Sequence, residues 1–143
     1  MVTSGESPRL TAVVVSLSDI TRLSRCLESL EVATRTVACE TIVVRAKRQP
    51  TDAALGRLAS RFAAVRVLDA PGDATVPLMR ALGVSASRSP VVALIEDDCI
   101  VRSDWAAAVV EAHTRPEAAI GGAVEPSRYA RALEWSVYFC DYG

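Results

Sequence analysis

The stretch Val91-Val92-Ala93-Leu94-Ile95-Glu96-Asp97-Asp98 joins the most apolar run of the chain directly to three consecutive acids. A continuous run of this length with β-branched residues is typical of a strand in a parallel sheet that is covered on both faces. We expect this strand to lie at the centre of the sheet. The acids that end it are costly to desolvate unless a cation, hydrogen bonds or water compensates them.

Strand-like and helix-like segments alternate on both sides of this stretch. Short β-branched or alternating runs predict strands, and apolar residues three or four apart predict helices. The predicted strands are Ala12 to Val15, Thr41 to Val44, Val65 to Leu68, Val91 to Ile95 and a short fifth strand at Ala118 to Val124. The predicted helices begin at Asp19 with Ser18 as N-cap, at Thr51 or Asp52, at Val76 with its end at Ser87, and after Ser103.

This alternation predicts an α/β fold with a mainly parallel sheet and helices on both faces, because right-handed crossovers connect parallel strands through helices. A polar tail, residues 1–9, precedes a single domain over residues 10–143. Gly83 lies in the middle of the third predicted helix, where a glycine lowers helix stability. We expect a glycine there because the helix packs closely against a neighbouring element.

Composition excludes several classes of protein. The chain has 143 residues and a formal net charge of −1, which argues against a nucleic-acid binder that neutralises phosphates. No apolar run approaches the roughly 18 to 20 residues of a membrane span. No signal peptide is visible, and the irregular spacing of the four cysteines does not fit a zinc site, so we expect reduced thiols and a cytoplasmic location.

Candidate site residues follow the predicted strands, because ligands of open α/β sheets bind outside the carboxyl ends of the strands. The acids of residues 96–98 suit Mg²⁺ or Mn²⁺, which take one or two carboxylates and complete their shell with water and phosphates. A nucleoside diphosphate or a similar ligand would then supply those phosphates. Alternatively, such acids cap the next helix or simply meet water. The cations Arg45, Lys47 and Arg48 could attract a phosphate or be merely solvated.

Other site motifs are missing from the sequence. It contains no GxxxxGK[ST] phosphate loop, no GxGxxG after the first strand, no GxSxG elbow and no HExxH. Phosphate-loop and dinucleotide-binding functions therefore lose most of their support. Cys99 lies beside the acids, which should raise its thiol pKa and work against a nucleophilic role.

In their order and spacing, several short motifs together resemble the nucleotide-sugar-binding half of a family 2 glycosyltransferase. The resemblance covers about residues 10–143. Besides the apolar first and second strands and the acids at residues 96–98, it rests on Arg25-Cys26-Leu27-Glu28-Ser29-Leu30, Arg80-Ala81-Leu82-Gly83, Trp105 and Gly121-Gly122.

The resemblance implies a GT-A fold, a nucleoside-diphosphate sugar as donor, an acceptor hydroxyl and a divalent cation. It implies that Glu96 and Asp98 hold the metal, with Asp97 between them at the nucleotide sugar. Ser16 and Arg80 would lie near the base and the phosphates.

The chain departs from the family pattern at several positions. Val15, Leu17 and Ser18 replace the usual Pro, Tyr and Asn, Ala81 replaces an Asn, and Arg45 stands in the nucleotide-binding region where an acid that reads the base is expected. Such enzymes usually continue through an acceptor half that supplies the general base, so the resemblance implies a truncated domain whose catalytic base is not identified. Glu125 and Asp141 are the late acids considered for this role, and Glu134 also lies near the end of the chain.

Two other functions remain open: a non-catalytic remnant or interaction module that keeps the fold, and a metal-dependent nucleotidyltransferase that binds a nucleoside triphosphate. The last stretch, Arg128 to Tyr142, has near-helical spacing and is rich in aromatic residues. These aromatic side chains either close the core over the sheet or form an apolar patch that invites self-association.

Overall fold

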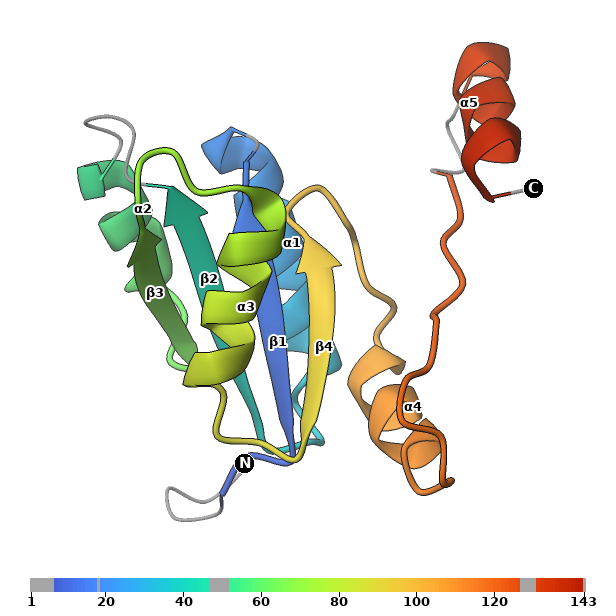
Figure 1. Cartoon of the computed structure of the whole chain (residues 1–143), viewed down its shortest axis with the longest axis horizontal. Helices are drawn as coiled ribbons and strands as arrows, with labels where there is room; N and C mark the ends of the chain where they lie inside the picture. Colours follow the sequence, from blue (N-terminus) through green and yellow to red (C-terminus); the bar gives the residue numbers. More distant parts are fainter. Residues whose placement is uncertain (1–6, 18, 47–51, 127–130, 143) are drawn as a thin grey trace.

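Four parallel strands form one sheet in the order β3-β2-β1-β4 (Figure 1). The structure is a computed structural model and describes residues 7–17, 19–46, 52–126 and 131–142. The strands are β1 (Leu10–Ser16), β2 (Cys39–Ala46), β3 (Val65–Ala70) and β4 (Val91–Glu96), and the helices are α1 (Ile20–Ala33), α2 (Asp52–Ala59), α3 (Val76–Ala86), α4 (Trp105–Ala112) and α5 (Ala132–Tyr142). The predicted α/β fold with a parallel sheet and helices on both faces is confirmed.

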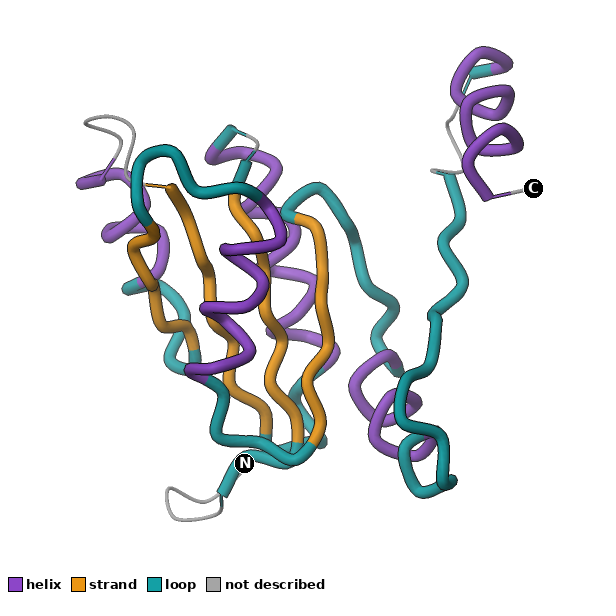
Figure 2. The backbone as a smooth tube through the Cα atoms, in the orientation of Figure 1, coloured by secondary structure: helices purple, strands orange, loops and turns teal. Residues whose placement is uncertain are grey.

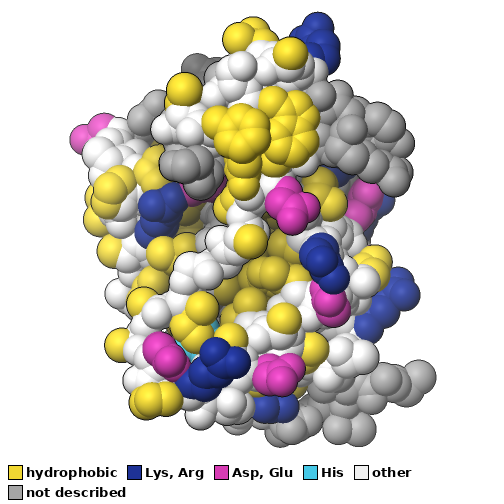
Figure 3. Space-filling view, turned by 90° about the vertical axis from the view of Figure 1, so that its right-hand side faces the viewer, with side chains coloured by type: hydrophobic (Ala, Val, Ile, Leu, Met, Phe, Trp, Pro, Cys, Tyr) yellow, Lys and Arg dark blue, Asp and Glu magenta, His cyan; other side chains and the backbone are white. Residues whose placement is uncertain are grey.

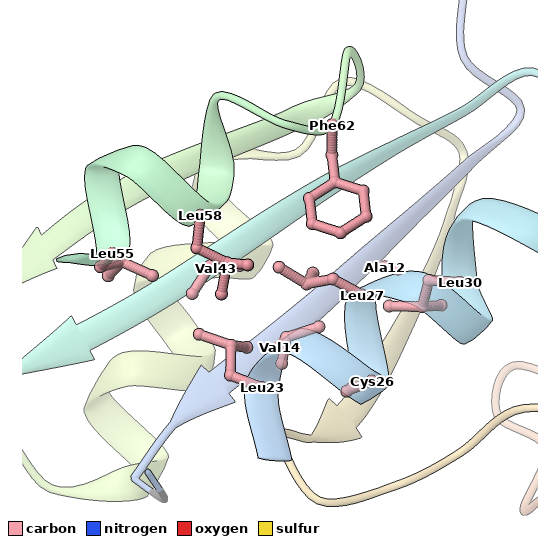
Figure 4. Close-up of a cluster of buried hydrophobic side chains, with 10 residues drawn as sticks. All are labelled: Ala12, Val14, Leu23, Cys26, Leu27, Leu30, Val43, Leu55, Leu58 and Phe62. Carbon is pink, nitrogen blue, oxygen red and sulfur yellow. The ribbon is translucent and has the colours of Figure 1, made fainter. Parts of the chain in front are cut away.

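Helices cover the two faces of the sheet unequally. On one face, α1 and α2 pack against alternate residues of β1 and β2, and the apolar spacing of α1 explains why: Leu23, Leu27 and Leu30 all point into the cluster shown in Figure 4. On the other face, α3 packs over β1 and β2 through Met79, which is 1% exposed. The central strands are therefore buried on both sides.

Strand β4 lies at an edge of the sheet, so its predicted central position is wrong. It pairs with β1 on one side, and no described strand pairs with the other side. Leu94 is paired in register with Val13 but is 51% exposed, because α3 lies over β1 and β2 and does not cover β4. Apolarity identified the strand, but apolarity does not determine the order of strands in a sheet.

Gly83 lets α3 approach the sheet closely, as predicted. A Cβ atom at this position would collide with the side chain of Val13 and lie 3.2 Å from a methyl carbon of Val44. The helix is therefore seated directly on β1 and β2, and this seating fixes the position of the residues that α3 carries toward the carboxyl ends of the strands.

A buried polar network ties the amino ends of the strands together around Glu40. This carboxylate accepts hydrogen bonds from the Thr11 hydroxyl at 3.0 Å, from the Arg88 backbone N–H at 2.9 Å and from the Arg88 guanidinium at 3.1 Å. The Arg66 guanidinium lies 3.4 Å away and also donates to the Ala86 carbonyl. The network connects the starts of β1, β2 and β3 to the turn between α3 and β4.

Two predicted helix caps are replaced by neighbouring residues. The N-cap of α1 is Asp19, whose carboxylate accepts from the Thr21 and Arg22 N–H groups, and the predicted cap Ser18 lies outside the described residues. The N-cap position of α4 holds Asp104 in place of Ser103, and its carboxylate pairs with Arg102 without capping the helix. Thr51, one of two alternatives for α2, also lies outside the described residues, and α2 begins at Asp52.

The chain after α4 stands apart from the sheet. Residues 118–124 form an exposed segment and not the predicted fifth strand, because no described strand provides the backbone partners that a strand requires (Figure 2). Helix α5 confirms the helical spacing of the last stretch, although Arg128 lies outside the described residues.

The aromatic residues of α5 do not close the core over the sheet, so that alternative is wrong. Trp135, Tyr138 and Phe139 contact one another with ring centroids 5.5 to 5.8 Å apart, and Phe139 is 61% exposed. Figure 3 views this side of the molecule and shows hydrophobic side chains gathered at the top and in the hollow below. No helix in the described part of the chain is long and apolar enough to cross a membrane.

Candidate functional site

The carboxyl ends of the strands bring most of the predicted site residues to one edge of the sheet. Ser16 is paired in register with Arg45, and Arg45 with Asp69. On the other side of β1, Val15 is paired with Glu96. A row of polar side chains therefore crosses the ends of all four strands, as expected from the carboxyl-end rule for parallel sheets.

Glu96, the last residue of β4, forms an ion pair with Arg80 of α3 through Oε1 and Nη2. Arg80 follows the buried Met79 and lies three residues before Gly83, so the close seating of α3 directs it toward the end of β4. The two side chains are 40% and 42% exposed, and the pair is therefore accessible to a ligand.

Asp97 is the structural member of the three acids. It is 2% exposed, and its Oδ2 accepts a hydrogen bond of 2.7 Å from the backbone N–H of Leu17. This contact fixes the acidic turn against the loop between β1 and α1. Asp97 is thus positioned to hold the acidic turn in place, and its role at the nucleotide sugar stays a prediction.

Asp98 is the exposed acid, with a side chain 54% accessible and Oδ2 4.0 Å from Nη1 of Arg22. Arg22 comes from the first turn of α1 and also lies 3.6 Å from Asp19. The sequence reasoning missed Arg22, because nothing in its local pattern distinguishes it from the other solvated residues on the polar face of α1.

Arg45 is held away from the acids at residues 96–98. Its Nε donates to Oδ1 of Asp69 at 2.9 Å, and its side chain is only 13% exposed. In the strand alternation, Arg45 follows Val43 on the α1 and α2 face, whereas Glu96 meets Arg80 on the α3 face. The Arg45–Asp69 and Arg80–Glu96 ion pairs therefore lie on opposite faces of the sheet edge.

Two thiols lie beneath the acidic turn. The Cys26 thiol contacts the Glu96 carbonyl at 3.7 Å, and the Cys99 backbone N–H donates to the same carbonyl at 3.2 Å. Burial, followed by the nearby Cys99 and acids, raises the pKa of Cys26 to about 12. Burial and then the charge of Asp98 raise the pKa of Cys99, which confirms the predicted direction and leaves both thiols protonated at neutral pH.

The acidic turn offers few side-chain ligands for a divalent cation. Within the described ranges, no three Asp, Glu, His or Cys side chains gather into a cation site. Mg²⁺ in phosphate-binding sites needs only one or two carboxylates, because water and phosphates complete its shell. Glu96 and Asp98 are hard oxygen donors with accessible carboxylates, but Glu96 pairs with Arg80 of α3 and Asp98 lies near Arg22 of α1, so the described contacts direct them to different helices.

Among known structures, 31 chains are similar to this fold. One is the crystal structure of residues 1–349 of TarS from S. aureus, a glycosyltransferase, with a TM-score of 0.61 and 14% sequence identity. The match covers 86% of this chain and 40% of that one, so this chain spans less than half the length of the TarS fragment. No protein-family model matches the chain, and no curated protein matches it. The similarity shows a shared fold, an α/β arrangement with a parallel sheet flanked by helices.

Proposed function

We propose that this chain is the donor-binding part of a family 2 type glycosyltransferase with a GT-A fold, and that it binds a nucleoside-diphosphate sugar. The observation that carries the proposal is the acidic turn of residues 96–98, which the Asp97–Leu17 hydrogen bond fastens at the carboxyl ends of β1 and β4. This is the position where parallel α/β sheets bind their ligands, and the similarity to TarS supports the same assignment.

Each polar group at this edge takes a role suited to its exposure. Asp98 and Glu96 hold Mg²⁺ or Mn²⁺, and a cation bound there stabilises the negative charge of the leaving diphosphate. Arg80 binds the diphosphate, because a guanidinium has only donor groups and phosphate oxygens accept them. Ser16 and Arg45 line the nucleotide side of the edge, and Asp97 positions the turn.

Transfer to an acceptor hydroxyl also requires a general base. Glu125 is exposed on the segment after α4, where its charge acts on Arg102, and nothing is described of the Asp141 side chain. Glu125 does not supply a base at the carboxyl ends of the strands. We therefore assign donor binding to this chain, and its general base stays unassigned.

Two further parts of the proposal concern self-association and the location of the protein in the cell. The exposed aromatic residues of α5 favour self-association through this helix. The four cysteines are free thiols, which supports a reducing, cytoplasmic setting.

Thermal unfolding with ligands tests donor binding, because a ligand that binds only the folded state raises the melting temperature. The chain is heated with Mn²⁺ and UDP, GDP or dTDP sugars. Asp98→Ala is compared with Glu111→Ala, which removes an exposed acid from α4. We expect a metal-dependent rise in Tm with one donor, kept in Glu111→Ala and lost in Asp98→Ala.

The other outcomes separate the alternatives. A folded chain whose Tm responds to no nucleotide would contradict the donor site and favour a non-catalytic remnant of the fold. A response to nucleoside triphosphates without a response to diphosphate sugars would instead favour a nucleotidyltransferase.

A further inference from the structure

Two of the four cysteines lie where separate segments of the chain meet. Cys26 is fully buried on the inner face of α1, and Cys99 is half-buried in the loop after β4. The Cys26 thiol contacts the Glu96 carbonyl oxygen at 3.7 Å, and the Cys99 backbone N–H donates to the same oxygen at 3.2 Å. The sulfur of one cysteine and the backbone of the other therefore meet at a single atom.

The loop that carries Cys99 is held against α1 at a second point. The Val101 backbone N–H donates to the Ser29 hydroxyl at 3.1 Å, and this hydroxyl donates to the Cys26 carbonyl at 2.7 Å. Ser29 lies three residues after Cys26, so the loop follows the helix over nearly one turn. The fold thus keeps Cys26 and Cys99 in fixed positions relative to each other.

The other two cysteines lie away from this contact. Cys39 begins β2 at the amino edge of the sheet, where its thiol contacts the Glu40 carbonyl at 3.3 Å. Cys140 is exposed on α5, which stands apart from the sheet (Figure 1). All four cysteines are free thiols in this structure. The fold therefore favours one pair, Cys26 with Cys99, over the other combinations.

We propose that Cys26 and Cys99 are a modification site, and that they form a disulfide when the protein meets a small-molecule disulfide such as oxidised glutathione. The bond would tie α1 covalently to the loop after β4, which hydrogen bonds hold against the helix in the reduced protein. This proposal is independent of donor binding, because it needs no nucleotide sugar and no cation.

The bond forms through two thiol–disulfide exchanges. Cys99 reacts first, because it is half-buried whereas Cys26 is closed to solvent. It loses its proton and attacks one sulfur of oxidised glutathione, which gives a mixed disulfide and releases one glutathione. Cys26 then loses its proton and attacks the Cys99 sulfur, and the second glutathione leaves. The two protein thiols lose two protons and two electrons, and the two glutathione thiols that leave carry them away.

Tryptic peptides identify the pair, because cleavage after arginine and lysine places each cysteine in a peptide of its own. Cys26 lies in residues 26–35, Cys39 in 36–45, Cys99 in 89–102 and Cys140 in 132–143. The folded Cys140→Ser variant, which lacks the exposed thiol of α5, is treated with oxidised glutathione, alkylated and digested without reductant. We expect mass spectrometry to find peptide 26–35 joined to peptide 89–102.

Matched variants and the unfolded chain make this result decisive. Cys39→Ser in the Cys140→Ser background should leave the cross-link unchanged, whereas Cys99→Ser should abolish it. In urea the contacts at the Glu96 carbonyl are lost, so the cross-linked fraction should fall severalfold. The proposal is wrong if the folded protein gives no such cross-link, stops at a mixed disulfide on Cys99, or forms the cross-link no more often than the unfolded chain.

Thermal unfolding provides a second measurement. The cross-linked protein should unfold about 10 °C above the reduced protein, because a bond between residues 26 and 99 closes a long loop and restricts the unfolded chain. Cys99→Ser after the same treatment should show no rise in Tm. A cross-linked protein whose Tm is unchanged or lowered would show that the two sulfurs do not meet in the native geometry, and would also overturn the proposal.

Discussion

Glu40 and Glu96 lie at opposite ends of the same sheet, and they differ in burial and in the number of side chains that contact them. Glu40 is 10% exposed at the side chain and accepts bonds from Thr11, Arg66 and Arg88, which come from three separate segments. Glu96 is 42% exposed and, among the described residues, pairs with the side chain of Arg80. The amino edge uses its acid to close the fold, whereas Glu96 and Asp98 at the carboxyl edge stay accessible to solvent.

Removal of the buried acid should have the largest effect on stability. We expect Glu40→Ala to lower the free energy of unfolding by about 3 kcal/mol, because Thr11 and the Arg88 N–H lose their buried acceptor. Urea unfolding measures the loss. Glu28→Ala, which removes an exposed acid from α1, should cost less than about 0.5 kcal/mol. Equal losses of unfolding free energy in the two variants would show that the buried acid is no more important for stability than an exposed one.

The second prediction concerns the helix that carries Arg80. Gly83→Ala should destabilise the protein by about 2 kcal/mol, because the added methyl group collides with Val13 and forces α3 away from the sheet. Gly56→Ala in α2 is the control with the opposite sign. Nothing lies within 4 Å of its Cβ position, so it should stabilise the helix by up to about 1 kcal/mol. Calorimetric or urea unfolding of both variants measures the two changes in the free energy of unfolding.

Acid should weaken the amino edge through Glu40. Burial alone would raise the pKa of Glu40, but the bonds from Arg88 and Thr11 outweigh it, and the pKa lies below its ordinary value. The stabilisation is therefore complete above the unfolded pKa and lost as pH falls through the lower folded pKa. Urea unfolding from pH 5 to 3 should show a shallower loss in Glu40→Gln than in the wild type; parallel curves would contradict this.

The smallest effect is expected at the carboxyl edge. Glu96→Gln should change the free energy of unfolding by less than about 0.5 kcal/mol, because a half-exposed ion pair contributes little to stability. A loss comparable to that of Glu40→Ala in urea unfolding would show that Glu96 is a structural acid like Glu40.

Local patterns in the sequence identified the elements but not all of their arrangement. Apolar and β-branched runs located all four strands of the sheet, and helical spacing located the buried residues of α1. The order of the strands depends on how helices cover each face, which no single run records. For that reason the central position predicted for β4 and the short fifth strand predicted at Ala118 to Val124 are both wrong.

At the candidate site too, the sequence predicted part of the arrangement and left part of it undetermined. The carboxyl-end rule placed Ser16, Arg45 and the acids at residues 96–98 at one edge, and the register confirms this. Nothing in the sequence distinguished the buried Asp97 from the exposed Asp98, because adjacent residues after a strand differ only in which way the turn points them. The Glu40 network was equally hidden, since its members come from separate segments and no motif connects them.

The open side of β4 governs how the protein behaves when it is concentrated. Its backbone donors and acceptors face no described strand, and the half-exposed Leu94 adds an apolar strip beside them. Such an edge is a template on which a strand of another molecule can add, so each addition exposes a new edge to the next. We expect a charge at residue 94 to reduce such strand addition when the protein is concentrated, because charged side chains block edge-to-edge pairing.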